Sequence, residues 1–275
     1  LNQLSDATPV LVDLKPTGPH YMEDLFAAGG IGAVLRELRP LLHLDCTTVT
    51  GDTLGDRLAG EGGYVDREVI RPVAEPVQEQ GGLVALFGSL APRGAILKRS
   101  AASPELFERE GRALVFSSLE DLAARIDDPE LDVGADDILV LRNAGPTSPS
   151  GMPEAGYLPI PAKLARSGVR DMLRISDARM SGTAFGTVVL HVAPDAASGG
   201  PLAAVRTGDR IRISVAERRL DLLVPESELA GRDSESFPIP ERGYARLYRE
   251  EVLQADLGCD LDFLRQTPTR PRGGS

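Results

Sequence analysis

The stretch DMLRISDARMSGTAFGTVVLHVAP, residues 171–194, holds two short apolar runs with a polar loop of small residues between them. Each run is short, rich in branched side chains and bounded by aspartate, glycine or proline, which is typical of a β-strand. The loop holds Ser181 between a methionine and a glycine. That serine is either part of a glycine-containing turn or a reacting group, and the stretch alone leaves both interpretations open.

Further runs of the same kind lie on both sides of this stretch, between about residues 81 and 232, and three helical stretches interrupt them. Many short strands with few helices predict a β-rich barrel or sandwich. The last two runs alternate apolar and polar residues and predict an antiparallel pair. The predicted strands lie within 81–88, 94–100, 112–118, 137–143, 171–177, 186–194, 208–215 and 218–225, and the predicted helices within 118–128, 159–168 and 225–232.

The two flanks of this region differ from it in pattern. Before residue 81, apolar residues at helical spacing on either side of Gly29-Gly30 predict two helices. After residue 235, apolar residues from Tyr244 to Ala255 follow helical spacing, so we expect one amphipathic helix that Gly258 ends. Ser118 is expected to be the N-cap of the helix within 118–128.

The composition argues against several classes of partner. The chain has 275 residues, 42% of them apolar, and its formal net charge of -11 argues against nucleic acid and anionic membranes. No apolar run approaches the ~20 residues of a membrane helix, and the first residues do not have the pattern of a secretory leader. The two cysteines, Cys46 and Cys259, belong to no CxxC pattern. We therefore expect a cytoplasmic protein without a disulfide framework.

Several loops beside the predicted strands are rich in glycine and polar residues, as loops that shape a binding cleft are. They include the motifs GSLAPRGAILKRSA (88–101), RNAGP and GMPEAG (142–156), DARMSGTAFGTVVLHVAP (177–194) and GGPLAAVRTGDRI (199–211). In this order, the motifs resemble the carboxy-terminal half of the dihydroxy-acid dehydratase and sugar-acid dehydratase family. PVLVDLKPTG (9–18) and TVTGDTLG (48–55) resemble the end of that family's first domain. The resemblance runs from about Pro9 to Leu264.

The resemblance implies an α/β fold with a domain boundary near residue 80. Residues 1–80 are expected to be the end of an α/β domain that binds the family's cluster. Residues 81–235 are expected to form a swivelling β-barrel domain with flanking helices. Residues 236–265 are expected to form a C-terminal helix that packs back, followed by a disordered tail over 266–275.

The resemblance also implies a dehydratase reaction, in which a 2,3-dihydroxy acid loses water and becomes a 2-keto-3-deoxy acid. DARMSGT and the closing RGY…GCD…DFL resemble the branch of the family that acts on sugar acids such as arabinonate or xylonate. The branch of branched-chain amino-acid biosynthesis usually has DGRFSGG at the serine motif. A sugar-acid substrate is therefore the first expectation and a dihydroxy acid of that pathway is the alternative.

Two residues take site roles from the family motifs. Glu154 in GMPEAG matches the family's Mg²⁺ ligand, although a glutamate there also suits a helix N-terminus. Ser181 matches the family's catalytic serine, which takes the C2 proton as an alkoxide and needs cations or amides to lower its pKa. The resemblance implies two cofactors, Mg²⁺ and an iron–sulfur cluster, with [2Fe–2S] expected rather than [4Fe–4S].

Other polar residues receive supporting or substrate-binding roles. Asp177 and Arg179 are expected to form a local pair that shapes the loop, or Arg179 faces a substrate carboxylate instead. The remaining candidates for substrate contact or loop support are Lys15, Thr17, Thr50 and Thr183. His43 and His191 lie in apolar runs and are expected to be core histidines, and both cysteines are expected to be buried thiols.

The family's cluster cysteines and its other Mg²⁺ ligands are expected in an amino-terminal half that these 275 residues do not include. The chain alone is therefore expected to bind no cluster, to hold Mg²⁺ weakly and to be inactive, with a homodimer or homotetramer as the family's usual assembly. A hypothesis from another class is a non-catalytic binding or assembly module. A native mass near 29 kDa favours the module, and about twice that mass favours the enzyme.

Overall fold

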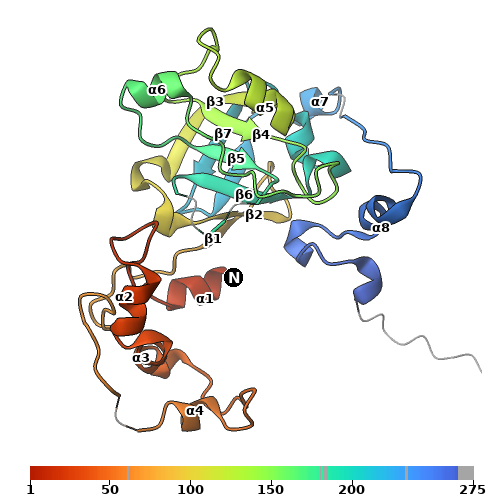
Figure 1. Ribbon diagram of the computed structural model, residues 1–275. Helices are drawn as coiled ribbons and strands as arrows, with labels where there is room; N and C mark the ends of the chain where they lie inside the picture. Colours follow the sequence, from red (N-terminus) through yellow and green to blue (C-terminus); the bar gives the residue numbers. More distant parts are fainter. Residues whose placement is uncertain (61, 180, 183–184, 233–234, 266–275) are drawn as a thin grey trace, which may run out of the picture. The chain divides into compact units, whose positions relative to one another are not determined.

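The computed structural model describes the whole chain except residues 61, 180, 183–184, 233–234 and 266–275 (Figure 1). The tail that the sequence predicts to be disordered lies outside the described residues. The described chain divides into two compact units. The first contains Leu1–Val84 and Arg99–Ala101, and the second contains Ala85–Lys98 and Ala102–Ser275.

The first unit is a small helical unit with extended segments. Its helices are α1 (Asn2–Ala7), α2 (Met22–Ala27), α3 (Gly30–Glu37) and α4 (Leu54–Arg57). The two helices predicted around Gly29 are confirmed, and Gly29 itself has a φ of 121°, which favours glycine. A short apolar cluster that includes Leu25 and Ile70 forms the core of the unit.

The second unit is built on an eight-stranded sheet. Seven strands fall within the predicted segments, whereas the strand Glu108–Phe116 begins four residues before the predicted segment 112–118, where its polar first half pairs with residues 210–214. The strand order is β1-β2-β6-β5-β4-β3-β7-β8, and a bridge between Phe87 and Arg219 joins the two outer strands, so the sheet closes as a barrel (Figure 1). The strands are β1 (Val84–Leu86), β2 (Gly94–Leu97), β3 (Glu108–Phe116), β4 (Ile138–Leu141), β5 (Arg174–Ser176), β6 (Val188–Ala193), β7 (Arg210–Ser214) and β8 (Arg219–Leu222).

The pairing of the strands determines where their loops lie. Strands β3, β4, β5 and β6 are parallel neighbours, whereas β2 pairs with β6, and β7 with β3 and β8, in antiparallel fashion. The predicted antiparallel pair of β7 and β8 is confirmed. Because parallel strands end at the same edge, the loops that follow β4, β5 and β6 start side by side.

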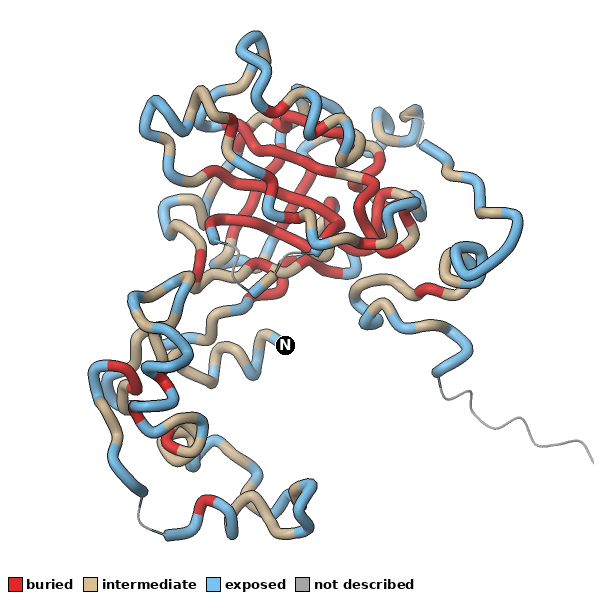
Figure 2. The backbone as a smooth tube through the Cα atoms, viewed as in Figure 1, coloured by how far each residue is buried: buried red, intermediate tan, exposed pale blue. Residues whose placement is uncertain are grey.

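The core lies in and around the parallel strands, where Figure 2 shows most of the buried residues. All four residues of β4 are fully buried, as expected for a parallel strand that is covered on both faces. Helix α5 (Leu119–Arg125) packs Leu122 against this core. The Oγ of Ser118 accepts a hydrogen bond from the Asp121 amide at 3.2 Å, so the predicted N-cap is confirmed.

The other helices of the second unit are short. They are α6 (Ala162–Arg166), α7 (Glu226–Leu229) and α8 (Gly243–Glu251). The prediction that the last helix continues to Gly258 is wrong. Helix α8 ends at Glu251, because Val252 is extended and pairs with Leu261. Gly258 instead follows a 3₁₀ turn with a φ of 86°. Among the described helices, none has both the length and the apolar character needed to cross a bilayer.

Candidate active site

The loops after β4 and β5 carry the two site residues singled out from the sequence. Glu154 lies in the first of these loops and Ser181 in the second. The two loops run side by side at Glu154 and Arg179, which form an isolated parallel bridge, and the Gly156 amide donates a 2.8 Å hydrogen bond to the Arg179 carbonyl. Backbone pairing thus holds the glutamate loop against the serine loop.

A buried carboxylate ties the starts of three loops together. Asp177 directly follows β5, and its side chain accepts hydrogen bonds from the Ala144 amide at 3.0 Å and the Ala196 amide at 2.9 Å. These amides belong to the loops after β4 and β6. Burial, together with the negative charge of Asp195, raises the pKa of Asp177 to about 7.

The predicted local pair of Asp177 and Arg179 is wrong. The Asp177 carboxylate is fully buried and faces backbone amides, so the arginine two residues later does not reach it. The Nη1 of Arg179 lies 3.4 Å from Oε2 of Glu154 instead, and both side chains are about half exposed, at 48% and 47%. An ion pair so exposed contributes little to stability.

A second carboxylate, which the sequence analysis missed, strengthens the same edge. Asp195 accepts hydrogen bonds from the amide and the hydroxyl of Thr147, both at 2.7 Å, and from Nε2 of Gln254 at 3.1 Å. It therefore connects the segment after β6 to the glutamate loop and to the C-terminal segment. The sequence did offer one signal for Asp195, because this aspartate directly follows the apolar run that ends at Pro194. An acid so close to a buried strand is itself buried, and a buried acid needs hydrogen-bond partners.

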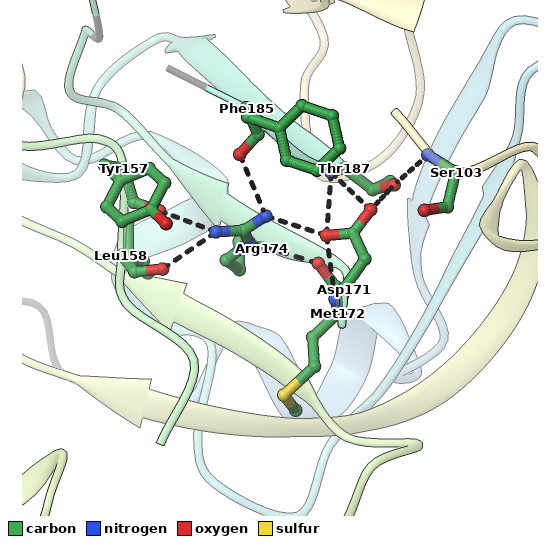
Figure 3. A network of polar contacts seen from close by, with 8 residues as sticks. All are labelled: Ser103, Tyr157, Leu158, Asp171, Met172, Arg174, Phe185 and Thr187. Atoms are coloured by element: carbon green, nitrogen blue, oxygen red, sulfur yellow. Dashed lines mark hydrogen bonds and ion pairs between the residues drawn. The ribbon is translucent and has the colours of Figure 1, made fainter. Parts of the chain in front are cut away.

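The far end of the serine loop is held by a buried guanidinium, drawn in Figure 3. Arg174 in β5 is 1% exposed, and its five N–H groups are matched by five hydrogen bonds. The acceptors are the Met172 carbonyl at 3.2 Å, the Tyr157 carbonyl at 3.0 Å, the Leu158 carbonyl at 3.1 Å, the Phe185 carbonyl at 3.4 Å and the Asp171 carboxylate at 2.8 Å.

Asp171 extends this network to the start of β6. Its carboxylate accepts hydrogen bonds from the amide of Thr187 at 2.8 Å and from its hydroxyl at 2.6 Å (Figure 3). The Thr187 hydroxyl in turn accepts from the Ser103 amide at 2.9 Å. Gly186 lies against the guanidinium with a φ of 103°, and a Cβ there would overlap Arg174 Nη2.

Ser181 lies between the Asp177 end and the Arg174 end of this loop. It is partly buried, and the carbonyl of the next residue, Gly182, accepts a 2.7 Å hydrogen bond from Lys98 Nζ. Lys98 was not singled out from the sequence, where a lysine at the end of an apolar strand has the pattern of an ordinary solvated residue. Thr183 lies outside the described residues.

The histidine and cysteine predictions have mixed outcomes. His43 and Cys46 are exposed, so their prediction as buried residues is wrong. His191 is partly buried in β6, and burial, together with the positive charge of Arg179, lowers its pKa. The imidazole is therefore neutral at pH 7. Cys259 is partly buried with its Sγ 3.3 Å from Sδ of Met152, in the loop that carries Glu154.

Lys15, Thr17 and Thr50 lie in the first unit, and their roles in substrate contact or loop support stay predictions. Lys15 is exposed, with its Nζ 5.6 Å from the centroid of the Tyr21 ring. Thr17 donates a 3.0 Å hydrogen bond to the Leu14 carbonyl, and Thr50 accepts one of 2.6 Å from Arg57. These contacts are local to the first unit.

The donor sets of the described residues fit the two expected cofactors differently. Within the described parts of the chain, no three His, Cys, Asp or Glu side chains group as a metal site. Glu154 fits the role of one Mg²⁺ ligand, because Mg²⁺ keeps several waters and takes one or two carboxylates. An iron–sulfur cluster needs about four protein ligands, mostly thiolates, so the two cysteines of this chain do not fit it.

Comparison with known proteins covers both units. The family model described as dihydroxy-acid/6-phosphogluconate dehydratase C-terminal matches residues 68–259, and its N-terminal counterpart matches residues 1–57. The chain is 51% identical over 269 residues to L-arabonate dehydratase of Azospirillum brasilense, covering 94% of this chain and 46% of the relative.

Two other relatives show similar coverage. The chain is 50% identical over 274 residues to 6-deoxy-6-sulfo-D-gluconate dehydratase of Pseudomonas putida, covering 96% of this chain and 47% of the relative. It is 43% identical over 266 residues to dihydroxy-acid dehydratase of Carboxydothermus hydrogenoformans, covering 94% and 47%. The chain therefore spans about half the length of the curated relatives that it matches.

The substitution Asp177→Asn tests the buried carboxylate. The pKa of Asp177 is raised from 3.8 to about 7, so the folded protein holds a proton there that the unfolded chain loses above about pH 4. The contribution of this group to stability is therefore complete below about pH 4 and is lost as the pH rises to about 7. We expect the unfolding free energy of the wild type, relative to D177N, to fall by up to ~1.4 kcal/mol per pH unit over this range.

Urea unfolding of both proteins at several pH values measures this difference. Because all other titrating groups are shared, they cancel in the comparison. A difference that does not change between pH 4 and pH 7 would contradict the raised pKa.

The substitution Gly186→Ala tests the packing around Arg174, and Gly168→Ala is its matched control. Gly168 has a similar φ of 99° with open space around its Cα, so alanine there should cost roughly 1 kcal/mol of backbone strain. At Gly186 the new methyl group also displaces the buried guanidinium, and we expect a loss of at least ~3 kcal/mol. Thermal and urea unfolding measure both losses, and equal losses would show that the guanidinium is not fixed there.

Proposed function

Because the chain belongs to the dihydroxy-acid/6-phosphogluconate dehydratase family, we propose that it carries the serine side of the active site of a hydro-lyase. The reaction removes water from a 2,3-dihydroxy acid and produces a 2-keto-3-deoxy acid. The observation that carries the proposal is the pairing of the glutamate loop with the serine loop at Glu154 and Arg179, between buried anchors on both sides.

The reaction needs a base at C2, positive charge near the substrate carboxylate and a Lewis acid for the hydroxide that leaves C3; the proposed iron–sulfur cluster would supply the Lewis acid. Ser181 acts as the base that takes the C2 proton, a role that requires its hydroxyl to be deprotonated more easily than in water. Glu154 would hold Mg²⁺, which supplies positive charge where the substrate gains electron density when C2 loses its proton. Backbone pairing at Glu154 and Arg179 holds the two loops together, so less reorganisation is needed during the reaction.

The weak pair of Glu154 and Arg179 suits such a role. At 3.4 Å and about half exposed, the arginine shields the carboxylate without burying it, so a cation from solvent can replace it. Arg179 is then released next to the site, where its guanidinium suits a substrate carboxylate. His191 beside it is neutral and adds no positive charge.

A sugar acid such as arabinonate or xylonate is the substrate that we propose. Two relatives with sugar-acid names are 51% and 50% identical to the chain, compared with 43% for a dihydroxy-acid dehydratase. The serine motif DARMSGT supports the same choice. The alternative is a dihydroxy acid of branched-chain biosynthesis, and a keto-acid assay with both substrate classes separates the two.

We propose Mg²⁺ and an iron–sulfur cluster as cofactors, with the cluster ligands supplied from outside these 275 residues. A homodimer or homotetramer in the cytoplasm completes the proposal. A native mass near 29 kDa, detected in cells with an antibody against this chain, would favour the non-catalytic binding module instead.

The substitution Ser181→Ala removes the proposed base. In the longest natural form of the protein, with Mg²⁺ and reconstituted cluster, we expect kcat on the preferred sugar acid to fall by about 10²- to 10⁴-fold. The control is Ser167→Ala at the end of α6, where the hydroxyl donates to the Leu164 carbonyl, and it should leave kcat unchanged. Comparable activity of S181A and wild type would exclude Ser181 as the base.

The substitution Glu154→Gln removes the proposed Mg²⁺ ligand. Its matched control is Glu217→Gln, because Glu217 forms an exposed pair with Arg212 at the same 3.4 Å distance. We expect the Mg²⁺ concentration needed for half-maximal activity to rise by about 10- to 100-fold in E154Q only. Titration of activity with Mg²⁺ measures this shift, and an unchanged midpoint would argue against the ligand role.

A further inference from the structure

Lys98 reaches the serine loop from the end of β2, inside the motif GSLAPRGAILKRSA, and has no role assigned so far. It directly follows β2, which pairs with β6 in antiparallel fashion, with Leu97 opposite Val189. The end of β2 therefore lies beside the start of β6, where the serine loop returns to the barrel. From there Lys98 Nζ donates a 2.7 Å hydrogen bond to the carbonyl of Gly182, the residue after Ser181.

The side chain of Lys98 is partly buried against the serine loop. Among the described residues it forms no ion pair with a carboxylate, and the Gly182 carbonyl is the hydrogen-bond partner that the structure gives it. Partial burial lowers the pKa of Lys98, because water does not fully solvate the ammonium. A positive charge that is partly removed from water is effective on its neighbours, because the local dielectric constant is lower.

The hydrogen bond from Lys98 to Gly182 lies near the middle of the serine loop, beside Ser181. Asp177 fixes the start of the serine loop and the Arg174 network fixes its end at Phe185. Both anchors are several residues away from Ser181. The Lys98 contact lies between these two anchors and holds the carbonyl of the residue next to the serine.

We propose that Lys98 is a positioning residue for Ser181, which anchors the Gly182 carbonyl and keeps a positive charge beside the serine. The inference rests on the proposed function for its catalytic consequence. A fixed carbonyl restricts the backbone of the residue before it, so the serine hydroxyl keeps one orientation toward C2 of the substrate. A nearby positive charge favours the deprotonated hydroxyl over the neutral one.

The test uses Lys98→Met, which keeps the length of the side chain but removes donor and charge, and Lys98→Arg, which restores both. The matched control is Lys163→Met. Lys163 also donates to backbone carbonyls, those of Pro129 and Leu131, but in a different part of the barrel domain. All variants are made in the longest natural form of the protein, and circular dichroism checks that they fold.

The first readout is independent of activity. Hydrogen exchange followed by mass spectrometry reports on peptides that cover residues 179–187. We expect exchange there to be about 10-fold faster in K98M than in the wild type, because a charge-assisted anchor is lost. K98R and K163M should exchange like the wild type over this segment. Unchanged exchange in K98M would overturn the anchoring.

The second readout is steady-state kinetics with the preferred sugar acid. We expect kcat of K98M to fall by about 10- to 100-fold with KM within about 2-fold, since the lysine acts on the serine and not on substrate binding. K98R should recover most of kcat, and K163M should keep all of it. A kcat of K98M within 2-fold of the wild type would overturn the positioning role.

The two readouts separate this inference from the proposed function. A wild type that dehydrates no sugar acid or dihydroxy acid would refute the proposed function, while hydrogen exchange would still decide whether Lys98 anchors the loop. If K98M does not fold, Lys98→Ala carries the hydrogen-exchange readout, because alanine also removes the donor, and Lys98→Gln carries the kinetic readout, because glutamine removes the charge. Wild-type exchange in K98A together with wild-type kcat in K98Q would then overturn the proposal.

Discussion

The buried ion pair of Arg174 and Asp171 is the constraint on which the shape of the candidate site depends. Both side chains are nearly inaccessible to water, at 2% and 5% exposure, so each of their polar atoms needs a partner inside the protein. The carbonyls that satisfy the guanidinium come from the segment after Glu154 and from the end of the serine loop (Figure 3). The buried guanidinium needs these carbonyls as hydrogen-bond acceptors, so it constrains the paths of the two segments.

Two other buried carboxylates constrain the loops at the opposite edge of the parallel strands. Asp177 and Asp195 accept backbone amides and a hydroxyl from the loops after β4 and β6. Each loop is thus fixed by buried polar contacts, while Glu154 and Arg179 between them stay about half exposed. Buried anchors around accessible side chains help a site to hold reacting groups in one arrangement.

The anchors give buried polar contacts to the loops that carry the candidate site. Loops that carry functional residues are usually mobile, because few buried contacts hold them. Here the glutamate loop and the serine loop pair with each other through backbone groups, and Lys98 adds a contact beside Ser181. The charged groups that border the site differ in their exposure, so the exposed ones can change partners while the buried ones cannot.

The sequence by itself determined the local elements and the identity of the motifs. Short apolar runs bounded by glycine and proline were sufficient to locate all eight strands, because strand length and residue type are local properties. The N-cap at Ser118 and the helices around Gly29 follow from equally local chemistry. The motifs around Glu154 and Ser181 indicated the family, because the order of residues along the chain can be compared without knowing which residues are in contact.

Tertiary structure alone decided which of these residues meet. The parallel pairing of β3 to β6 arises from long-range contacts, and it sets the neighbours of every loop at that edge. The partner of Arg179 is therefore Glu154, 25 residues away, and not Asp177, two residues away. Likewise α8 stops at Glu251 because Val252 pairs with Leu261, which helical periodicity does not detect. Burial is a property of the packed chain, so the roles of Asp195, Arg174 and Lys98 emerged only there.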